Sequence, residues 1–155
     1  APRLVFEIKP EPDPSVTLPE GFSIHAVTAE LLASGIGGLD TLREEMCSER
    51  ISVEDFLENS FGVCPVYENQ IAGWCLSEYN TGDQCEIGIA TLEPHQRRGI
   101  ATALTKAFLS KAAARGYRRV GWDCWERNAP SVATACKAGF TLARREQALV
   151  VIPAQ

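Results

Sequence analysis

The chain has 155 residues, of which 45% are hydrophobic and 23% charged, values typical of a single globular domain. No apolar run reaches the roughly 18 residues that a membrane-spanning helix needs, so the sequence argues against an integral membrane protein, and no signal peptide is recognised. The six cysteines include no C-x-x-C pair. This pattern argues against a zinc site and favours reduced thiols, and we expect a cytoplasmic protein without a bound metal.

Charge is distributed unevenly along the chain. Residues 1–96 carry 17 acidic and 4 basic side chains, a net charge of −13, whereas residues 97–145 carry 2 acidic and 11 basic ones, a net charge of +9. This division predicts two surfaces that face differently charged partners, although two ordinary solvated faces would give the same counts. The net charge of −5, with no aromatic platform recognised among the basic residues, argues against nucleic-acid binding.

The first 19 residues contain five of the nine prolines, and we interpret residues 1–19 as a proline-rich linker or extension ahead of a domain over residues 20–155. Within it, residues 3–8 (RLVFEI) predict a short strand with no evident partner. We expect this strand to fold back on the edge of the sheet or to pair with a neighbouring chain. The sequence begins with Ala rather than Met, and we expect it to be a fragment whose upstream part is absent.

Alternating apolar residues, capping residues and turn signals predict the elements of the domain in chain order. A strand over 21–27 precedes three short helices over 29–34, 39–47 and 53–59. Three strands over 62–68, 71–80 and 83–92 form an antiparallel meander, followed by a long helix over 99–115. A strand (118–125), a helix (129–139) and two strands (140–146 and 148–153) complete the chain. We therefore predict an α/β (α+β) fold with a mixed, mostly antiparallel sheet of about seven strands and helices on both faces.

The stretch QRRGIA, residues 96–101, stands between the predicted strand that ends near residue 92 and the long helix. A helix N-terminus exposes unpaired N–H groups and the positive end of the helix dipole, and therefore binds anions such as phosphate. Gly99 has no Cβ and allows an anion to approach the backbone closely, while Arg97 and Arg98 add positive charge. The sequence thus predicts a pyrophosphate-binding loop; a helix-initiating glycine beside two solvated arginines is the alternative.

Two motifs carry a resemblance to a known family. QRRGIA has the Q/R-x-x-G-x-G/A pattern of the GNAT superfamily of acetyl-CoA-dependent N-acyltransferases, and NAPSVATACKAGF, residues 128–140, resembles the second motif of that family with its spacing kept. The resemblance covers residues 21–153, and the two stretches look closest to the zwittermicin A resistance-type branch. It implies a GNAT-like fold with a V-shaped splay between the fourth and fifth strands of the predicted domain.

The resemblance also implies a cofactor site. Backbone groups of the fourth strand would pair with the pantetheine arm of acetyl-CoA, and one N–H of that strand would face the thioester carbonyl. The loop at residues 96–101 would hold the pyrophosphate. Asn128 would bind the pantetheine or simply cap its helix. The cofactor-binding residues expected in this way are Ile89, Ala90, Thr91, Gln96, Arg97, Arg98, Gly99, Ile100, Ala101, Thr102, Asn128 and Ser131. The tyrosine that many members use as general acid is replaced here by Ala135, which leaves that role unassigned.

Two acids in otherwise apolar strands are candidates for the catalytic base, which takes a proton from the attacking ammonium. Asp123 is favoured over Glu86, and for both we expect burial to raise the pKa towards neutrality. An ion pair with an arginine is the alternative explanation for either acid. Trp122 and Trp125 are expected to face away from Asp123 and to serve packing.

These features together predict an acetyl-CoA-dependent N-acetyltransferase that acts on a primary amine of a small molecule. Residues 40–58 hold seven acids against two arginines, and we expect this segment to favour a cationic amine; a solvated acidic helix face is the alternative. Two other functions stay open, an acyl-CoA-binding sensor without turnover and a protein N-acetyltransferase. Acetyl-CoA and the amine are the expected partners, neither nucleic acid nor a membrane is expected, and a homodimer is left open.

Overall fold

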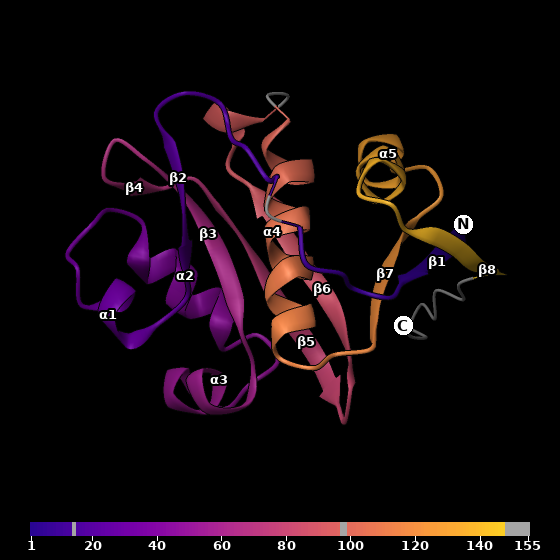
Figure 1. Ribbon diagram of the computed structural model, residues 1–155, viewed down its shortest axis with the longest axis horizontal. Coiled ribbons are helices and arrows are strands. Elements are labelled where there is room, and N and C mark those ends of the chain that lie inside the picture. The colour runs from indigo at the N-terminus through magenta and orange to yellow at the C-terminus, as the bar shows by residue number, and fades with distance from the viewer. Residues whose placement is uncertain (14, 97–98, 148–155) are drawn as a thin grey trace, which may run out of the picture.

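Strands from both ends of the chain meet in one sheet. The computed structural model describes residues 1–13, 15–96 and 99–147 (Figure 1). The strands are β1 (Pro2–Ile8), β2 (Phe22–Ala26), β3 (Gly62–Tyr67), β4 (Gln70–Ile71), β5 (Gly73–Thr81), β6 (Gln84–Thr91), β7 (Arg119–Trp125) and β8 (Thr141–Gln147). Their order across the sheet is β2-β3-β5-β6-β7-β1-β8, with β4 paired to β3.

The sheet opens between β6 and β7. These two strands are the parallel pair in a sheet whose other named pairs are antiparallel. They pair only from Gln84 opposite Arg119 to Glu86 opposite Gly121, although β6 continues to Thr91 and β7 to Trp125. Beyond Glu86 the two strands are no longer paired. The predicted α/β class, the mostly antiparallel sheet and the splay between the predicted fourth and fifth strands are therefore confirmed, and the described residues form eight strands where about seven were expected.

Helices cover the two faces of the sheet unequally. The helices are α1 (Ala29–Leu32), α2 (Leu39–Met46), α3 (Val53–Asn59), α4 (Ile100–Ala114) and α5 (Ala129–Lys137), with a short 3₁₀ helix at Glu93–His95. On one face, α4 packs against β3, β5 and β6 and buries Leu104 and Phe108 in a core that also contains Val120 and Trp122 of β7. On the other, α2 buries Leu42 against β3 and β5, beside α1 and α3. Because this second layer lies over one half of the sheet, no helix that the structure describes covers the other half of that face, which we call the open face (Figure 1).

The helix ends follow the capping signals of the sequence. Thr28 and Ser52 accept hydrogen bonds from the backbone N–H groups three residues on, at 3.1 and 3.0 Å, as N-cap residues do. α4 instead begins after Gly99, whose φ of 74° lies in the left-handed region, and no side chain caps it. A non-glycine residue is strained in that conformation, so glycine at this position leaves the first N–H groups of α4 without a side-chain partner.

The strand expected over residues 3–8 forms, but its position differs from the expectation. β1 lies inside the sheet, between β7 and β8, and not at its edge (Figure 1). Leu4 and Phe6 point into the core, where they are 8% and 3% exposed. The sequence contained no signal for this pairing, because both partner strands lie more than 110 residues further along the chain. The segment ahead of the prolines is thus part of the sheet.

Two of the other predicted strands differ in extent from the observed ones, and one cannot be compared. The strand over 140–146 corresponds to β8, and the one over 148–153 lies outside the described residues. The strand expected over 71–80 is divided into β4 and β5. Cys64, Cys75 and Cys85 are free and buried, as expected, and burial raises the pKa of the Cys64 and Cys85 thiols to about 12. Among the helices that the structure describes, none is both long and apolar enough to cross a membrane.

Candidate active site

The sheet opening leads into a groove of about 610 Å³ on the α4 side of the sheet. Its walls are the end of β6, the first turn of α4, the Trp122 indole of β7 and the first turns of α5. The groove brings together ten of the twelve residues expected to bind the cofactor: Ile89, Ala90, Thr91, Gln96, Gly99, Ile100, Ala101, Thr102, Asn128 and Ser131. The other two, Arg97 and Arg98, lie outside the described residues.

The first turn of α4 gives the groove its anion-binding character. A Cβ built on Gly99 would meet no atom within 4 Å, so the space in front of this glycine is open. α4 is 15 residues long, and its first intrahelical bond runs from Ala103 N–H to the Gly99 carbonyl at 3.2 Å. The N–H groups ahead of Ala103 therefore carry the partial positive charge of the helix dipole into the groove, where an anion such as pyrophosphate would sit.

The loop between β6 and α4 is held by its own side chains. The Gln96 amide donates a hydrogen bond from Nε2 to the carbonyl of Thr91 at 3.0 Å, which ties the end of β6 to the start of the loop. His95 also lines the groove, a residue that sequence reasoning left aside. Its ring packs against those of Phe22 and Tyr67, each 5.4 Å away between centroids, and these two rings lie 4.6 Å from each other. Thr91 Oγ1 and His95 Nδ1 are buried and have no hydrogen-bond partner among the described residues.

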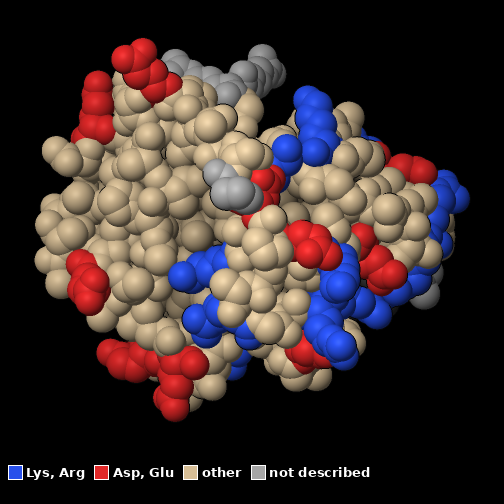
Figure 2. Space-filling model, in the orientation of Figure 1, with Lys and Arg blue, Asp and Glu red and all other residues tan. Residues whose placement is uncertain are grey.

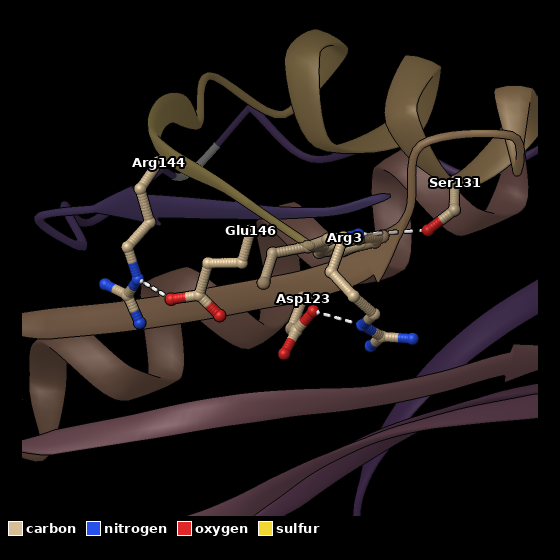
Figure 3. A network of polar contacts seen from close by, with 6 residues as sticks. Arg3, Asp123, Ser131, Arg144 and Glu146 are labelled. Atoms are coloured by element: carbon tan, nitrogen blue, oxygen red, sulfur yellow. Dashed lines mark hydrogen bonds and ion pairs between the residues drawn. The ribbon is translucent and has the colours of Figure 1, made fainter. Parts of the chain in front are cut away.

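The opposite wall is built by α5 and β7. Asn128 is the N-cap of α5, and its Oδ1 accepts a hydrogen bond from Ser131 N–H at 3.3 Å, so the capping role holds whether or not Asn128 also binds a ligand. Ser131 Oγ accepts a hydrogen bond from Trp122 Nε1–H at 3.0 Å (Figure 3). Trp122 is 4% exposed and packs on Phe140. The expected packing role of this tryptophan is thus confirmed, and its indole also fixes the α5 wall.

The position where many family members carry a tyrosine faces the core and not the groove. Ala135 is fully buried in the hydrophobic core. The neighbouring Cys136 is exposed and is absent from the groove lining. Neither side chain is therefore placed to protonate a leaving group in the groove.

On the open face of the sheet, Asp123 is not the buried acid that the sequence predicted. Its side chain is 39% exposed, and Oδ1 accepts a hydrogen bond from Arg3 Nε at 2.8 Å (Figure 3). Arg3 also lies over the Trp125 ring at 4.7 Å from its centroid. Trp125 and Asp123 share one face of β7, so the expectation that both tryptophans face away from Asp123 is wrong for Trp125. Arg3 belongs to β1, whose pairing the sequence did not reveal, and it supplies the ion pair that was the alternative.

Glu86 lies on the same open face and keeps the environment expected of it. It is partly buried, and burial, followed by the charge of Asp123, raises its pKa above the ordinary value. Strand pairing is regular from Glu86 to Thr91, with no bulge at Gly88. Glu86, Gly88 and Ala90 therefore point to the open face, while Ile87, Ile89 and Thr91 point to the groove side.

A second glutamate, Glu78 of β5, stands directly opposite Glu86. Directly opposite residues of an antiparallel pair point to the same face, so the two carboxylates are neighbours. Burial raises the pKa of Glu78, and the charges of Glu49, Glu45 and Glu86 raise it further. Sequence reasoning missed this residue. The signal that could have revealed it is the register of the β5–β6 hairpin, which pairs Glu78 in the stretch SEYN with Glu86 in the stretch CEIG.

The surface charge follows the division seen in the sequence. Figure 2 shows Lys and Arg gathered over the centre and right of one face, where α4, β7 and α5 lie in Figure 1, while Asp and Glu alone mark its left part.

In the described part of the chain, no group of three or more His, Cys, Asp or Glu side chains is arranged to hold a metal ion. A second hollow of about 660 Å³ lies beside β2 and α1, lined by residues such as Ser23 and His25.

Comparisons with known proteins agree with this geometry. The family model described as GNAT acetyltransferase matches residues 13–149. The chain is 25% identical over 139 residues to the uncharacterized N-acetyltransferase YdfB of Bacillus subtilis (strain 168), covering 89% of this chain and 52% of the relative. It thus spans about half the length of that curated relative.

Solved structures show the same fold. A GCN5-related N-acetyltransferase-like protein from Streptococcus suis 89/1591 superposes with a TM-score of 0.71 and 21% identity, over 94% of this chain and 59% of that one. A GCN5-related N-acetyltransferase from Sphaerobacter thermophilus gives a TM-score of 0.68 and 22% identity, over 93% and 49%.

Proposed function

Because this chain belongs to the GNAT acetyltransferase family, we propose that it transfers the acetyl group of acetyl-CoA to a primary amine of a small, cationic molecule. The observation that carries this proposal is the groove at the sheet opening. There the end of β6, the uncapped start of α4 and the first turn of α5 line one space. The acceptor and the partners of the whole protein are likewise proposed.

The residues of the groove fit the parts of acetyl-CoA. The N–H groups at residues 99–102 would bind the pyrophosphate, and the open space in front of Gly99 leaves room for it. Unpaired backbone groups of β6 near Ile89 and Thr91 would pair with the pantetheine arm, because β7 no longer occupies that edge beyond Glu86. The buried Thr91 Oγ1 has no partner among the described residues, which is consistent with a polar ligand at this strand end.

The chemistry then needs a proton acceptor on the open face. An acceptor ammonium loses one proton to a carboxylate, and its nitrogen lone pair attacks the thioester carbonyl carbon. The C–N bond forms, the C–S bond breaks, and the sulfur leaves as a thiolate. The nitrogen gives up a second proton as the amide forms, and the thiolate takes one up from solvent. A backbone N–H of β6 would stabilise the developing oxyanion.

Acidic residues on the open face favour a cationic acceptor. Glu45 belongs to α2 and Glu49 follows it, and the charges of both act on Glu78. Glu78 in turn stands opposite Glu86. A negative field of this kind concentrates cations and accelerates their association, an effect that salt weakens. The finer resemblance to the zwittermicin A resistance-type branch stays a prediction, and a homodimer also stays a proposal.

The experiment that tests the function is a panel of acceptors incubated with acetyl-CoA, with coenzyme A and the acetylated products measured by mass spectrometry. We expect turnover with an amino sugar or a polyamine, at a rate that falls with added salt, and little turnover with an amino acid of net negative charge. Binding of acetyl-CoA without product from any amine or peptide would favour the sensor alternative. Acetylation of peptides alone would favour the protein N-acetyltransferase.

A further inference from the structure

The open face of the sheet treats its carboxylates in two different ways. On β7, β1 and β8 each described acid on this face has an arginine partner. Asp123 pairs with Arg3 at 2.8 Å and Glu146 with Arg144 (Figure 3), and Glu7 pairs with Arg119 at 3.2 Å. On β5 and β6, by contrast, neither Glu78 nor Glu86 forms an ion pair within 4.0 Å in the part of the chain that the structure describes. Like charges directly opposite each other destabilise a sheet, so this unpaired couple calls for an explanation.

Glycine at position 88 makes room for one of the two carboxylates. A Cβ built on Gly88 would lie 2.0 Å from Glu78 Oε1 and 2.6 Å from Glu78 Cδ. The Glu78 carboxylate therefore lies across the backbone of β6, over the residue that directly precedes Ile89. That point is two residues past the last pair of β6 with β7, Glu86 opposite Gly121. The carboxylate is thus held where the sheet opens, on the face opposite the groove.

The charges around the two glutamates differ in sign. Glu86 faces Asp123 on β7, but it also faces Arg119 of β7, Arg144 of β8 and Arg3 of β1, and these three guanidinium groups favour its ionised form. The charges that act on Glu78 come from Glu49, Glu45 and Glu86, and all are negative. Two interacting carboxyl groups titrate as a unit. The surroundings of Glu78 therefore all favour a bound proton, whereas for Glu86 three guanidinium groups counteract the effects of burial and of Asp123.

We propose that Glu78 is the catalytic base of the transfer reaction and that Glu86 is the ionised group that holds the acceptor ammonium. This assignment rests on the proposed function. The acceptor, as R–NH₃⁺, docks against Glu86 and passes one proton to the Glu78 carboxylate. The free amine then attacks as described above, and Glu78 returns its proton to solvent after the product leaves.

Three variants test the assignment. Glu78→Gln keeps the size of the side chain and removes the base, so kcat/KM at neutral pH should fall by about 10²-fold or more, while the Kd for acetyl-CoA stays the same. The acidic limb of the wild-type pH–rate profile should be lost. Gly88→Ala should lower kcat by displacing the Glu78 carboxylate, a flexible side-chain end that can move without unfolding the sheet. Glu86→Gln should mainly raise KM for the amine.

A double variant and a control separate a specific role from a general loss of charge. If Gly88→Ala acts only through Glu78, then Glu78→Gln combined with Gly88→Ala should be no slower than Glu78→Gln alone. Glu20→Gln removes a carboxylate from an exposed position outside the site and should leave activity unchanged. Turnover and a pH profile like those of the wild type in Glu78→Gln would overturn the assignment, as would a pH limb lost only in Glu86→Gln or Asp123→Asn.

A measurement without substrate distinguishes this assignment from the function itself. Nuclear magnetic resonance titration of ¹³C-labelled glutamate carboxyl groups, assigned with Glu78→Gln, follows the carboxyl directly. We expect Glu78 to titrate above Glu86. If the wild type turned over no acetyl-CoA, the proposed function would fail. The titration would still test which of the two carboxyl groups, Glu78 or Glu86, has the higher pKa. Titration of Glu78 at the ordinary glutamate value would contradict the assignment.

Discussion

At the scale of single residues, environment separates acids that look alike in the sequence. Asp123 and Glu86 both stand in apolar strands, and the sequence favoured Asp123. In the fold, Asp123 is 39% exposed and bound by Arg3, whereas Glu86 and Glu78 are partly buried and have no such partner among the described residues. An exposed ion pair contributes only about 0–1 kcal/mol to stability. The ion pair with the arginine on β1 is consistent with a structural role for Asp123, and our proposal gives the catalytic role to the β5–β6 pair.

The same environment predicts how stability depends on pH. Burial and neighbouring acids raise the pKa of Glu78 above its ordinary value of 4.5, so the folded state binds more protons than the unfolded state between that value and the raised pKa. The favourable contribution is complete below pH 4.5 and is lost as the pH rises through the raised pKa. Glu78→Gln removes the titrating carboxyl group and, with it, this loss of stability at higher pH. In urea unfolding measured from pH 4 to pH 8, the variant should gain stability relative to the wild type as the pH rises.

The Glu20→Gln variant supplies the reference for that series, because its carboxylate is exposed. Its free energy of unfolding should follow the wild-type curve across the range. A Glu78→Gln variant that runs parallel to the wild type at every pH would show that Glu78 titrates normally in the folded state.

At the scale of elements, our proposal places the phosphate groups of the cofactor at the start of α4. Gly99 and Gly116 flank the helix, both have positive φ (74° and 87°), and a Cβ on either would meet no atom within 4 Å. Alanine at either position should therefore cost a similar amount of stability, about 1–2 kcal/mol. Only Gly99→Ala places a methyl group in the groove. Calorimetric titration should show acetyl-CoA affinity at least about tenfold weaker, or about 1.4 kcal/mol, for Gly99→Ala, and unchanged affinity for Gly116→Ala.

Equal affinities in the two glycine variants would show that the start of α4 does not hold the cofactor. The comparison is informative because both variants carry the same backbone strain. A loss of binding common to both would point to instability of α4 as a whole.

Local signals in the sequence predicted most of the elements, and their failures share one cause. The helices at 29–32, 53–59, 100–114 and 129–137 carry their own caps, glycines and apolar faces, and the β5–β6 hairpin has its turn residues. Insertion of β1 between β7 and β8 depends on pairing across more than 110 residues, which no local pattern records. The same holds for the site. Many of the groove residues lie in or directly beside two contiguous motifs, which local patterns can reveal. The positions of Arg3 beside Asp123 and of Glu78 beside Glu86 depend instead on cross-strand register.

At the scale of the whole molecule, the sheet opening connects two surfaces of different charge. Basic side chains gather over the part that holds α4, β7 and α5, and acids mark the α1–α3 part (Figure 2). In our proposal the groove on one side of the sheet binds the anionic cofactor, and the open face on the other side, beside Glu78 and Glu86, receives a cationic amine. The reacting atoms would meet where β6 and β7 separate. The chain spans about half the length of the curated relative it matches, so the remainder of such a protein has room to complete the acceptor side.

Hydrogen–deuterium exchange of the wild-type chain with and without acetyl-CoA tests most directly that this groove is the cofactor site. We predict slower exchange at the end of β6, in the first turn of α4 around residues 99–102 and at the start of α5, with little change in α2 and α3. Protection confined to the hollow beside β2 and α1, or no protection at millimolar acetyl-CoA, would contradict the account.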